Sequence, residues 1–285
     1  MNRFASGPKR HYYGKGDVIA YRLKRNGKAL TDGSPVFGVN VLLLVYGDAF
    51  WKTYTQGDNT GLVATDSMKN FVQRETMNFD GDDMEGYCRF IGEMFLAKYP
   101  QVAGLQLSAT QIQYSAVGGN VAFAPSSGDT PTARLEIDRS GIVEAVSGVR
   151  GFKLLRLGGS AFRGFVRDEY TTLPDLHNRP LHMWLDLEWS YQTADAAFSG
   201  GTVTARARHI VREVFTSFVS GSIQQLIYQM GTRLLVEIPA MSDVRLEANN
   251  RTWDTIAERG DELGVYTDAR PPYGCLGLTL RRDDL

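Results

Sequence analysis

Apolar and polar positions alternate with a period of two along the first part of the chain, as they do in half-buried β-strands. This pattern predicts a strand over 17–24 and a longer strand that starts near Val36. Four residues of the longer strand share one apolar face: Val39, Val41, Leu43 and Val45. A Gly33-Ser34-Pro35 turn separates the two strands, so we expect a long hairpin.

Helical spacing replaces this alternation in two stretches that follow. The first opens at Thr65-Asp66-Ser67 with residues that commonly cap helices, and the second begins after Asp82 or Asp83 and stops at Pro100. The apolar residues of the second stretch recur at helical intervals: Met84, Tyr87, Cys88, Ile91, Met94 and Phe95. One buried helix face is therefore predicted.

The order of elements is then repeated in the second half of the chain. The first half closes with strands predicted over 102–116, 121–124 and 133–149. The second half has strands over 152–157 and 181–191, helical spacing over 203–218 and 223–230, and strands over 234–238, 244–247 and 275–280. Glycines near 147–151 mark the boundary. Two units, 10–149 and 150–285, predict an α+β fold with antiparallel sheets that helices cover on one face.

Composition removes several classes of function. The 285 residues include 31 Lys+Arg and 32 Asp+Glu, and a net charge of −1 argues against a nucleic-acid partner. Only two cysteines are present, Cys88 and Cys275, which excludes a disulfide framework and suits a reducing compartment. No apolar run approaches the roughly 18 to 20 residues of a membrane helix, and the N-terminus lacks a secretory signal. We therefore expect a cytoplasmic protein without a membrane partner.

Familiar cofactor signatures are missing as well. The four histidines include no His-x-x-x-His pair, so no metal site is expected. Lys15 lies between two glycines but lacks the spacing of a phosphate loop, and by itself is a solvated lysine in a turn. There is neither a Gly-x-Ser-x-Gly motif nor a dinucleotide fingerprint.

Two polar stretches in apolar surroundings remain as candidate binding sites. Thr65 and Asp66 stand where a strand passes into a helix, and backbone N–H groups at such a point can hold an anionic or carbonyl-rich ligand. An ordinary N-cap is the simpler interpretation. The segment 162–173, followed by Arg179, combines aromatic rings with guanidinium groups that suit a flat anionic heterocycle. Taken singly, Phe162 is typical of a core residue and Arg179 of a surface ion pair.

Together these segments resemble the signature stretches of the urate oxidases (uricases). The matching stretches are Tyr13-Gly14-Lys15, Asp58-Asn59-Thr60, Val63-Ala64-Thr65-Asp66-Ser67-Met68-Lys69-Asn70, Phe162-Arg163-Gly164-Phe165, Asp168-Glu169-Tyr170-Thr171-Thr172-Leu173 and Ala269-Arg270-Pro271-Pro272-Tyr273-Gly274. They follow the family's order over nearly the whole chain, and the last carries one extra proline.

The resemblance implies a fold, an assembly and a reaction. The fold would be two tandem tunnelling-fold (T-fold) units, and four chains would form a barrel-like homotetramer with a central tunnel. The reaction would be the oxidation of urate by O₂ and water to 5-hydroxyisourate and H₂O₂ in purine degradation. It would need neither a metal nor an organic cofactor, and its sites would lie between two subunits.

The resemblance also implies substrate-binding residues. Phe162 would stack on the purine, and Arg179 would pair with a urate carbonyl and ring nitrogen. Ser222-Ile223-Gln224 resembles the family's Ser-Val-Gln, so the N–H of Ile223 and the side chain of Gln224 would hold the other edge.

A second group of residues would come from the neighbouring subunit. Thr65 and Asp66 would reach the five-membered ring, with Lys15 behind the Thr65 hydroxyl. Lys15 and Thr65 would act as the catalytic pair, taking a proton from urate and passing it to reduced oxygen.

The chain departs from the family pattern after Pro239, where many uricases carry Pro-Asn-Lys-His-Tyr. The best match by spacing puts Asn250 on the asparagine that holds O₂ or water, Arg251 on the lysine and Thr252 on the relay histidine. Asn249 takes the asparagine's place if the alignment slips by one. Thr252 or a water would then replace the imidazole, or activity is reduced, or the reaction differs.

Two other functions are compatible with the same segments in principle. One is a purine- or pterin-binding T-fold protein with reduced or lost oxidase activity. The other is a T-fold pterin enzyme of the cyclohydrolase kind, which needs a Cys/His zinc site that this sequence does not supply.

Overall fold

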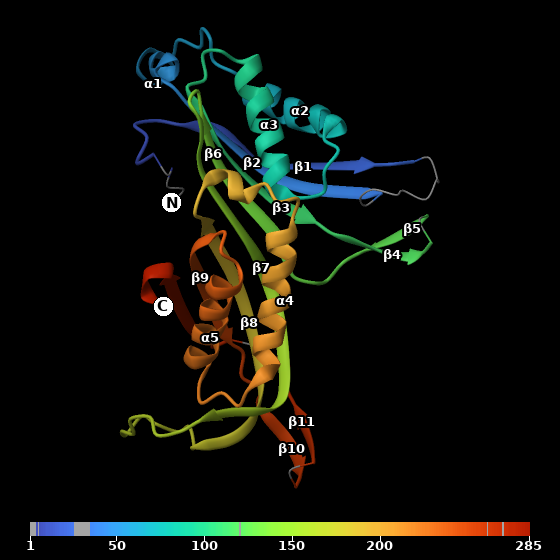
Figure 1. Cartoon of the computed structure of the whole chain (residues 1–285), viewed down its shortest axis with the longest axis vertical. Helices are drawn as coiled ribbons and strands as arrows, with labels where there is room; N and C mark the ends of the chain where they lie inside the picture. The colour runs from blue at the N-terminus through green and yellow to red at the C-terminus, as the bar shows by residue number, and fades with distance from the viewer. Residues whose placement is uncertain (1–3, 5, 26–34, 120, 261, 270) are drawn as a thin grey trace. The chain divides into compact units, whose positions relative to one another are not determined.

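The computed structural model describes residues 4, 6–25, 35–119, 121–260, 262–269 and 271–285. The chain divides into two compact units. Unit 1 comprises Met1–Gly148 and Ser190–Thr204, and unit 2 comprises Val149–Trp189 and Ala205–Leu285. Antiparallel strands and a few helices build both units (Figure 1), so the predicted α+β class is confirmed. Gly33 and Ser34 of the expected turn, and Arg270 of the last motif, lie outside the described residues.

Unit 1 has a sheet in the strand order β1-β2-β3-β6-β7 with helices on one face (Figure 1). The strands are β1 (Tyr13–Leu23), β2 (Val36–Tyr46), β3 (Gly104–Ile112), β6 (Thr130–Asp138) and β7 (Gly141–Phe162), with a separate pair, β4 (Tyr114–Gly118) and β5 (Ala122–Pro125). The helices are η1 (Asp48–Phe50), α1 (Trp51–Gln56), α2 (Thr65–Glu75), η2 (Thr76–Asn78), α3 (Met84–Lys98) and η3 (Ala194–Ala197). β1 and β2 pair antiparallel with Val18 opposite Val41, which confirms the predicted hairpin.

Unit 2 has the strand order β7-β8-β9-β12, beginning with the later part of β7. Its further strands are β8 (Leu176–Tyr191), β9 (Met241–Asn250) and β12 (Gly274–Arg281), with a separate hairpin of β10 (Thr255–Arg259) and β11 (Leu263–Tyr266). Its helices are α4 (Thr202–Ser217), α5 (Ile223–Glu237) and η4 (Arg282–Asp284). Across the stretches that the structure describes, no helix is both long and apolar enough to span a membrane.

One local expectation is wrong. Residues 234–238 do not form a strand, because Leu234 and Leu235 continue the buried stripe of α5 and the next strand starts only at Met241. The boundary near 147–151 does not coincide with the end of a strand: β7 runs from Gly141 to Phe162, and the division between the two compact units falls within it, after Gly148. Gly151 has a left-handed φ of 75° within that strand.

The core of unit 1 follows the predicted faces. Four residues of β2 are at most 1% exposed: Val39, Val41, Leu43 and Val45. The apolar stripe of α3 packs on this side, and of its predicted members only Met94 is not fully buried. Asp83 is the N-cap of α3, where its carboxylate accepts a hydrogen bond from the Gly86 N–H at 2.7 Å.

Each unit places one long helix on its sheet through the same kind of close contact. Gly92 lies in α3 and Gly231 in α5, and both helices are 15 residues long. A Cβ atom at Gly92 would lie 2.5 Å from Ile137 Cδ1, and one at Gly231 would lie 2.7 Å from Leu280 Cδ1. The backbone of each helix therefore approaches its sheet at a position where no side chain fits.

The correspondence between α3 and α5 extends over both ends of the helices. Ser222 caps α5 by accepting a hydrogen bond from the Gln225 N–H at 3.1 Å, as Asp83 caps α3. The same number of positions separates Asp83 from Ser222, Gly92 from Gly231, and Pro100 from Pro239. The N-cap residue, the glycine at the close contact and the proline after the helix therefore recur at the same spacing in the two units.

An arginine anchors the C-terminal end of each of these helices. Arg139 donates hydrogen bonds to the carbonyls of three residues at 2.8 to 3.0 Å: Leu96, Tyr99 and Val102. Arg282 donates to three carbonyls at 2.7 to 3.0 Å: Leu235, Ile238 and Met241. These carbonyls belong to the last helical turn and to the turn that leads to the next strand. A cation at a helix C-terminus satisfies orphan acceptors and favours the helix dipole.

A buried polar network closes the start of α3 in unit 1. Glu85 is 5% exposed and accepts hydrogen bonds from the hydroxyls of Ser147 and, at 3.3 Å, Thr204. The Tyr191 hydroxyl donates to Ser147 Oγ at 2.7 Å. Burial raises the pKa of the Glu85 carboxyl above its ordinary value.

Loss of the Arg282 anchor is expected to destabilise the fold. In Arg282→Ala three carbonyls lose a charged donor, so we expect the free energy of unfolding to fall by about 1–3 kcal/mol. Arg150→Ala is the control, because Arg150 makes an exposed pair with Glu188 at 3.0 Å and should change stability by less than about 0.5 kcal/mol. Urea denaturation followed by circular dichroism measures both, and equal losses would contradict the anchoring role.

The Glu85 network predicts a pH-dependent stability. Between the ordinary pKa and the raised one, folded Glu85 keeps a proton that the unfolded chain releases, so the free energy of unfolding falls as pH rises. Glu85→Gln removes this dependence, so its free energy of unfolding relative to the parent chain should be higher at pH 8 than at pH 5. Denaturation at both pH values tests this, with the exposed Glu93→Gln as control. The prediction is refuted if Glu85→Gln and the parent chain show the same change in the free energy of unfolding between pH 5 and pH 8.

Candidate functional site

A pocket of about 230 Å³ opens in unit 2 beside the start of α5. Ten residues from β7, β8, α5, β9, β12 and the loops next to them line it: Phe162, Leu173, Arg179, Ile223, Gln224, Asn250, Thr252, Gly274, Cys275 and Leu276. Six of the sequence-predicted residues are therefore brought to one cavity although they span much of the second half of the chain.

An aromatic ring and a guanidinium group form one side of this pocket. Phe162 ends β7, and its ring stacks on Phe165 with centroids 5.0 Å apart and planes 13° apart. Arg179 lies on β8 with its Cζ 5.8 Å from the Phe162 ring centroid. Phe162 is half-exposed rather than a core residue, so the ring has a face available at the pocket.

Arg179 is partly desolvated and has free donor capacity. Its Nε is buried without a hydrogen-bond partner, and it forms no ion pair, among the residues that the structure describes. The simpler interpretation of Arg179 as a surface ion pair is therefore wrong. Burial lowers the pKa of its guanidinium, which nevertheless stays charged at neutral pH. A planar ligand with adjacent acceptors would satisfy this group.

The N-terminus of α5 also lies at the pocket and provides donors. Ser222 Oγ accepts from the Gln225 N–H, and the first N–H groups of a helix have no partner within it. Ile223, the first residue of α5, is 4% exposed and lines the pocket. Gln224 is exposed and adds a side-chain amide, which both donates and accepts. The positive end of the helix dipole also favours an anion here.

Alternation along β9 decides between the two candidate asparagines. Asn250 is the last residue of β9, pairs with Gly274 of β12 and lines the pocket. Asn249 does not line it, and its Oδ1 lies 3.9 Å from Cys275 Sγ. Thr252, two positions after Asn250, also lines the pocket. The structure therefore places Asn250 and Thr252, but not Asn249, at this cavity.

The remaining predicted residues lie together in unit 1. Thr65 is the first residue of α2, and Ala64 is its N-cap, so the interpretation of Thr65 or Asp66 as a capping residue is wrong. The Asp66 carboxylate accepts from Lys69 Nζ at 2.7 Å and from Asn70 Nδ2 at 2.9 Å. The hydrogen bond from Lys69 is the main cause of its lowered pKa, and the charge of Lys15 on β1 contributes.

The link between β1 and α2 explains why Lys15 lies near the start of that helix. The Val63 N–H donates to the Tyr13 hydroxyl at 3.0 Å, and Gln73 Nε2 donates to the Ile19 carbonyl at 3.1 Å. These bonds hold the helix alongside the strand. The expected residues thus form two groups, six of them at the pocket of unit 2 and three at this edge of unit 1.

Cys275 and Leu276 of β12 were not anticipated as pocket residues from the sequence, and Gly274 was part of a recognised motif without an assigned role. Gly274, Cys275 and Leu276 reach the cavity because β12 pairs with β9 in a register that sets Gly274 opposite Asn250. Once Asn250 is a candidate, its strand partner would be one too, but the pairing itself is not visible in local sequence. Leu173 was part of a recognised motif without an assigned role.

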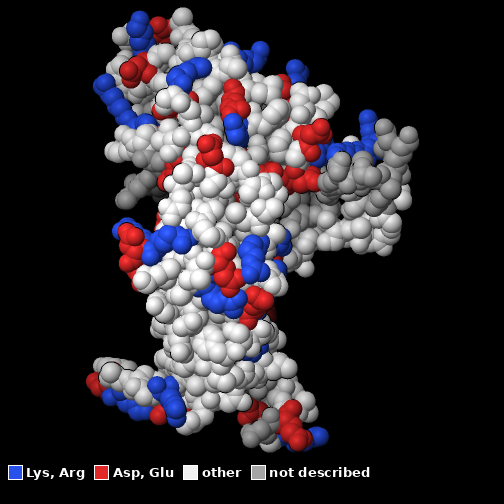
Figure 2. Space-filling model, viewed as in Figure 1, with Lys and Arg blue, Asp and Glu red and all other residues white. Residues whose placement is uncertain are grey.

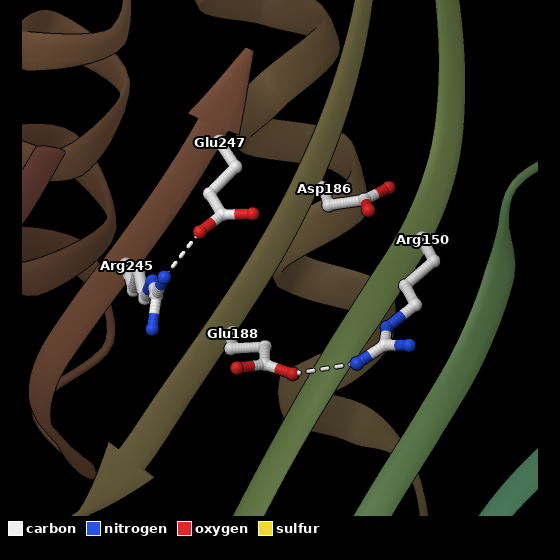
Figure 3. Close-up of a pocket in the computed structure, with 5 residues that line it drawn as sticks. All are labelled: Arg150, Asp186, Glu188, Arg245 and Glu247. Carbon is white, nitrogen blue, oxygen red and sulfur yellow. Dashed lines mark hydrogen bonds and ion pairs between the residues drawn. The ribbon is translucent and has the colours of Figure 1, made fainter. Parts of the chain in front are cut away.

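A second depression in unit 2 is lined by charged residues (Figure 3). It measures about 220 Å³, and five residues line it: Arg150, Asp186, Glu188, Arg245 and Glu247. Arg150 pairs with Glu188 at 3.0 Å, and Arg245 pairs with Glu247. Asp186 accepts a hydrogen bond from the Gly151 N–H at 2.8 Å. Because each charge already has a partner, this depression is a weaker candidate for a ligand site.

Charge and metal ligands do not indicate any other site. On the face shown in Figure 2, groups of Lys and Arg alternate with groups of Asp and Glu. Within the described ranges, no group of three or more His, Cys, Asp or Glu residues is arranged to hold a metal ion. Both cysteines are free thiols, with Cys88 buried and Cys275 exposed.

Comparison with known sequences gives one consistent result. The family model described as Uricase matches residues 145–276. The chain is 38% identical to the "Uric acid degradation bifunctional protein" of Bacillus sp. (strain TB-90), covering 96% of this chain and 61% of that protein. It is 33% identical to the "Uricase" of Haloferax volcanii, covering 96% of this chain and 98% of that protein. The chain thus spans about three fifths of the bifunctional relative.

Solved structures give the same result. A uricase from "Bacillus fastidious" superposes with a TM-score of 0.85 at 33% identity, covering 97% of this chain and 95% of that one. A hyperthermostable mutant of Bacillus sp. TB-90 urate oxidase superposes with a TM-score of 0.84 at 36% identity, covering 96% of this chain and all of that one.

Proposed function

The chain belongs to the uricase family, and on that premise we propose that it is a urate oxidase. The reaction takes urate, O₂ and water to 5-hydroxyisourate and H₂O₂. The observation that carries the proposal is the pocket of unit 2, where an aromatic face, an unpaired guanidinium and a helix N-terminus surround a cavity of about 230 Å³. These groups are complementary to a flat purine anion with carbonyls along its edges.

Substrate binding follows from the donors around the pocket. Phe162 stacks on the purine ring, and Arg179 donates to an adjacent carbonyl and ring nitrogen. The Ile223 N–H and the Gln224 amide hold the opposite edge. The positive charge of Arg179 and the dipole of α5 both favour the urate anion over neutral purines.

Oxygen is placed at the side of the pocket formed by the end of β9. Asn250 supplies an amide and Thr252 a hydroxyl, and both line the cavity. In this proposal they hold O₂ or water above the ring, and Thr252 takes the place of the family's relay histidine. The electron-rich urate anion reduces O₂, while the protein positions the reactants and routes protons.

The proton route is assigned to the group in unit 1. Thr65 and Asp66 approach the five-membered ring, and Lys15 lies behind the Thr65 hydroxyl. Lys15 and Thr65 take the proton that urate releases and pass it to reduced oxygen, which leaves as H₂O₂. No metal or organic cofactor enters this scheme. The pair comes from a neighbouring chain of a homotetramer, so each site is completed between subunits.

We also propose that 10–149 and 150–285 are tandem T-fold units of a barrel-like assembly with a central tunnel. The recurrence of cap, glycine, proline and arginine in α3 and α5 supports two related units. We expect the assembly in the cytoplasm.

A purine- or pterin-binding protein with reduced or lost oxidase activity is the alternative. Thr252 favours it, because a hydroxyl is a weaker proton carrier than an imidazole near neutral pH. Urate that binds but is not consumed would support this alternative. The pterin cyclohydrolase idea finds no zinc site among the described residues.

Urate turnover tests the main proposal directly. Aerobic protein treated with a chelator should remove the near-ultraviolet absorbance of urate and form about one H₂O₂ per urate consumed. Arg179→Gln should raise KM for urate by about 100-fold, because a buried charge-assisted contact is lost. Arg89→Gln, on the exposed surface of α3, should leave KM unchanged. No turnover by folded parent protein would reject the proposal.

The proton relay makes a separate prediction. Thr65→Ala should lower kcat by about 100-fold or more, because general acid–base groups commonly contribute that much. Thr55→Ala is a matched control, since Thr55 is exposed on α1 and its hydroxyl donates to the Trp51 carbonyl of the same helix at 3.2 Å. Full turnover by Thr65→Ala would remove Thr65 from the mechanism without affecting the assignment of the substrate.

A further inference from the structure

Arg251 stands between the two pocket residues Asn250 and Thr252, yet it does not line the pocket. Its guanidinium is enclosed by two aromatic rings. The Cζ atom lies 4.0 Å from the Trp184 ring centroid and 3.9 Å from the Tyr273 ring centroid. A planar cation can stack on a ring with each of its faces, which an ammonium group cannot do.

The segment around Arg251 has few other attachments. β9 ends at Asn250, and residues 251–254 have no regular secondary structure. The Arg251 N–H donates to the His182 carbonyl at 3.0 Å. The next backbone attachment is at Asp254, which exchanges hydrogen bonds with Thr267. Thr252 lies outside the strands, so its position depends on contacts of its neighbours Arg251 and Trp253.

Trp184, one of the two rings that enclose Arg251, is itself held in place. Trp184 Nε1 lies 3.3 Å from His182 Nε2, as donor to acceptor. The His182 ring packs on Trp253 with centroids 5.3 Å apart, and Trp253 packs on Tyr266 at 5.5 Å. We call the stack of Trp184, Arg251 and Tyr273 the Arg251 sandwich. It joins β8 to the segments before and after the β10–β11 hairpin.

We propose that Arg251 is a positioning residue for the oxidation step, an inference that rests on the proposed urate oxidase function. By stacking between Trp184 and Tyr273, Arg251 holds Asn250 and Thr252 where they can fix O₂ or water above the purine. Urate itself is held by residues on other elements: Phe162, Arg179, Ile223 and Gln224. Loss of the sandwich thus affects the oxygen side of the pocket and leaves urate binding intact.

Four variants test this separation. Arg251→Ala removes the cation, and Arg251→Lys keeps the charge but loses the two-faced stack. Tyr273→Leu removes one ring, and Tyr273→Phe is the matched control because it keeps the ring. For the first three we expect kcat to fall about 10- to 100-fold, as displacement of a reacting group by about 1 Å can cause. KM for O₂ should rise in the same variants, and Tyr273→Phe should stay within about two-fold of the parent.

Binding of urate without oxygen separates positioning from general damage. The Kd for urate, measured anaerobically by quenching of tryptophan fluorescence in variants that keep Trp184, should stay within about two-fold of the parent value. Thermal unfolding identifies any variant that fails to fold. If an Arg251 variant does not fold, the comparison of kcat between Tyr273→Leu and Tyr273→Phe tests the positioning role. Unchanged kcat and KM for O₂ in Arg251→Ala, or a parallel loss of anaerobic urate binding, would overturn the inference. A parent protein without urate turnover would instead reject the proposed function.

Discussion

Close contact between a helix backbone and a sheet is the constraint on which both units depend. Gly92 and Gly231 allow this contact, since a Cβ at either position would meet a side chain of the sheet within 3 Å. Arg139 and Arg282 then hold the helix ends through carbonyls of the last turn. A helix fixed in the middle and at one end has a defined position for its other end. In unit 2 that end is the N-terminus of α5, where donors face the pocket.

The two units use equivalent helix starts differently. Gln224 is the second residue after the N-cap Ser222. Glu85 is likewise the second residue after the N-cap Asp83. Gln224 is exposed at an open pocket, whereas Glu85 is buried in hydrogen bonds with Ser147 and Thr204. A closed polar network stabilises structure without binding a ligand, so one copy of the arrangement serves the fold and the other is available for a substrate.

Much of the fold could be predicted from local pattern, because period-two and helical spacing act within a few residues. The β1–β2 hairpin and the Asp83 cap are examples. The strand expected over 234–238 failed because an aliphatic run fits either a strand or a buried helix, and the contacts with the sheet favour the helix. Phe162 and Arg179 were candidates from their aromatic and guanidinium chemistry, and their individual roles came from motif resemblance. Cys275 and the stacking of Arg251 depend on strand register and on distant rings, which no local pattern contains.

In the proposed site the hydroxyl of Thr252 stands in for an imidazole, and this has a consequence for the chemistry. A hydroxyl can pass a proton along a hydrogen-bonded chain, but it does not store a charge near neutral pH as histidine does. If urate is oxidised at this pocket, protons must therefore be held elsewhere, and in the proposed scheme Lys15 is the basic group available. A relay without storage works only while its members stay in hydrogen-bond contact, because transfer occurs at heavy-atom separations of about 2.6–3.2 Å. The reaction then requires that Thr252 be held rigidly. The stacking of Arg251 between Trp184 and Tyr273 is the contact that would hold it.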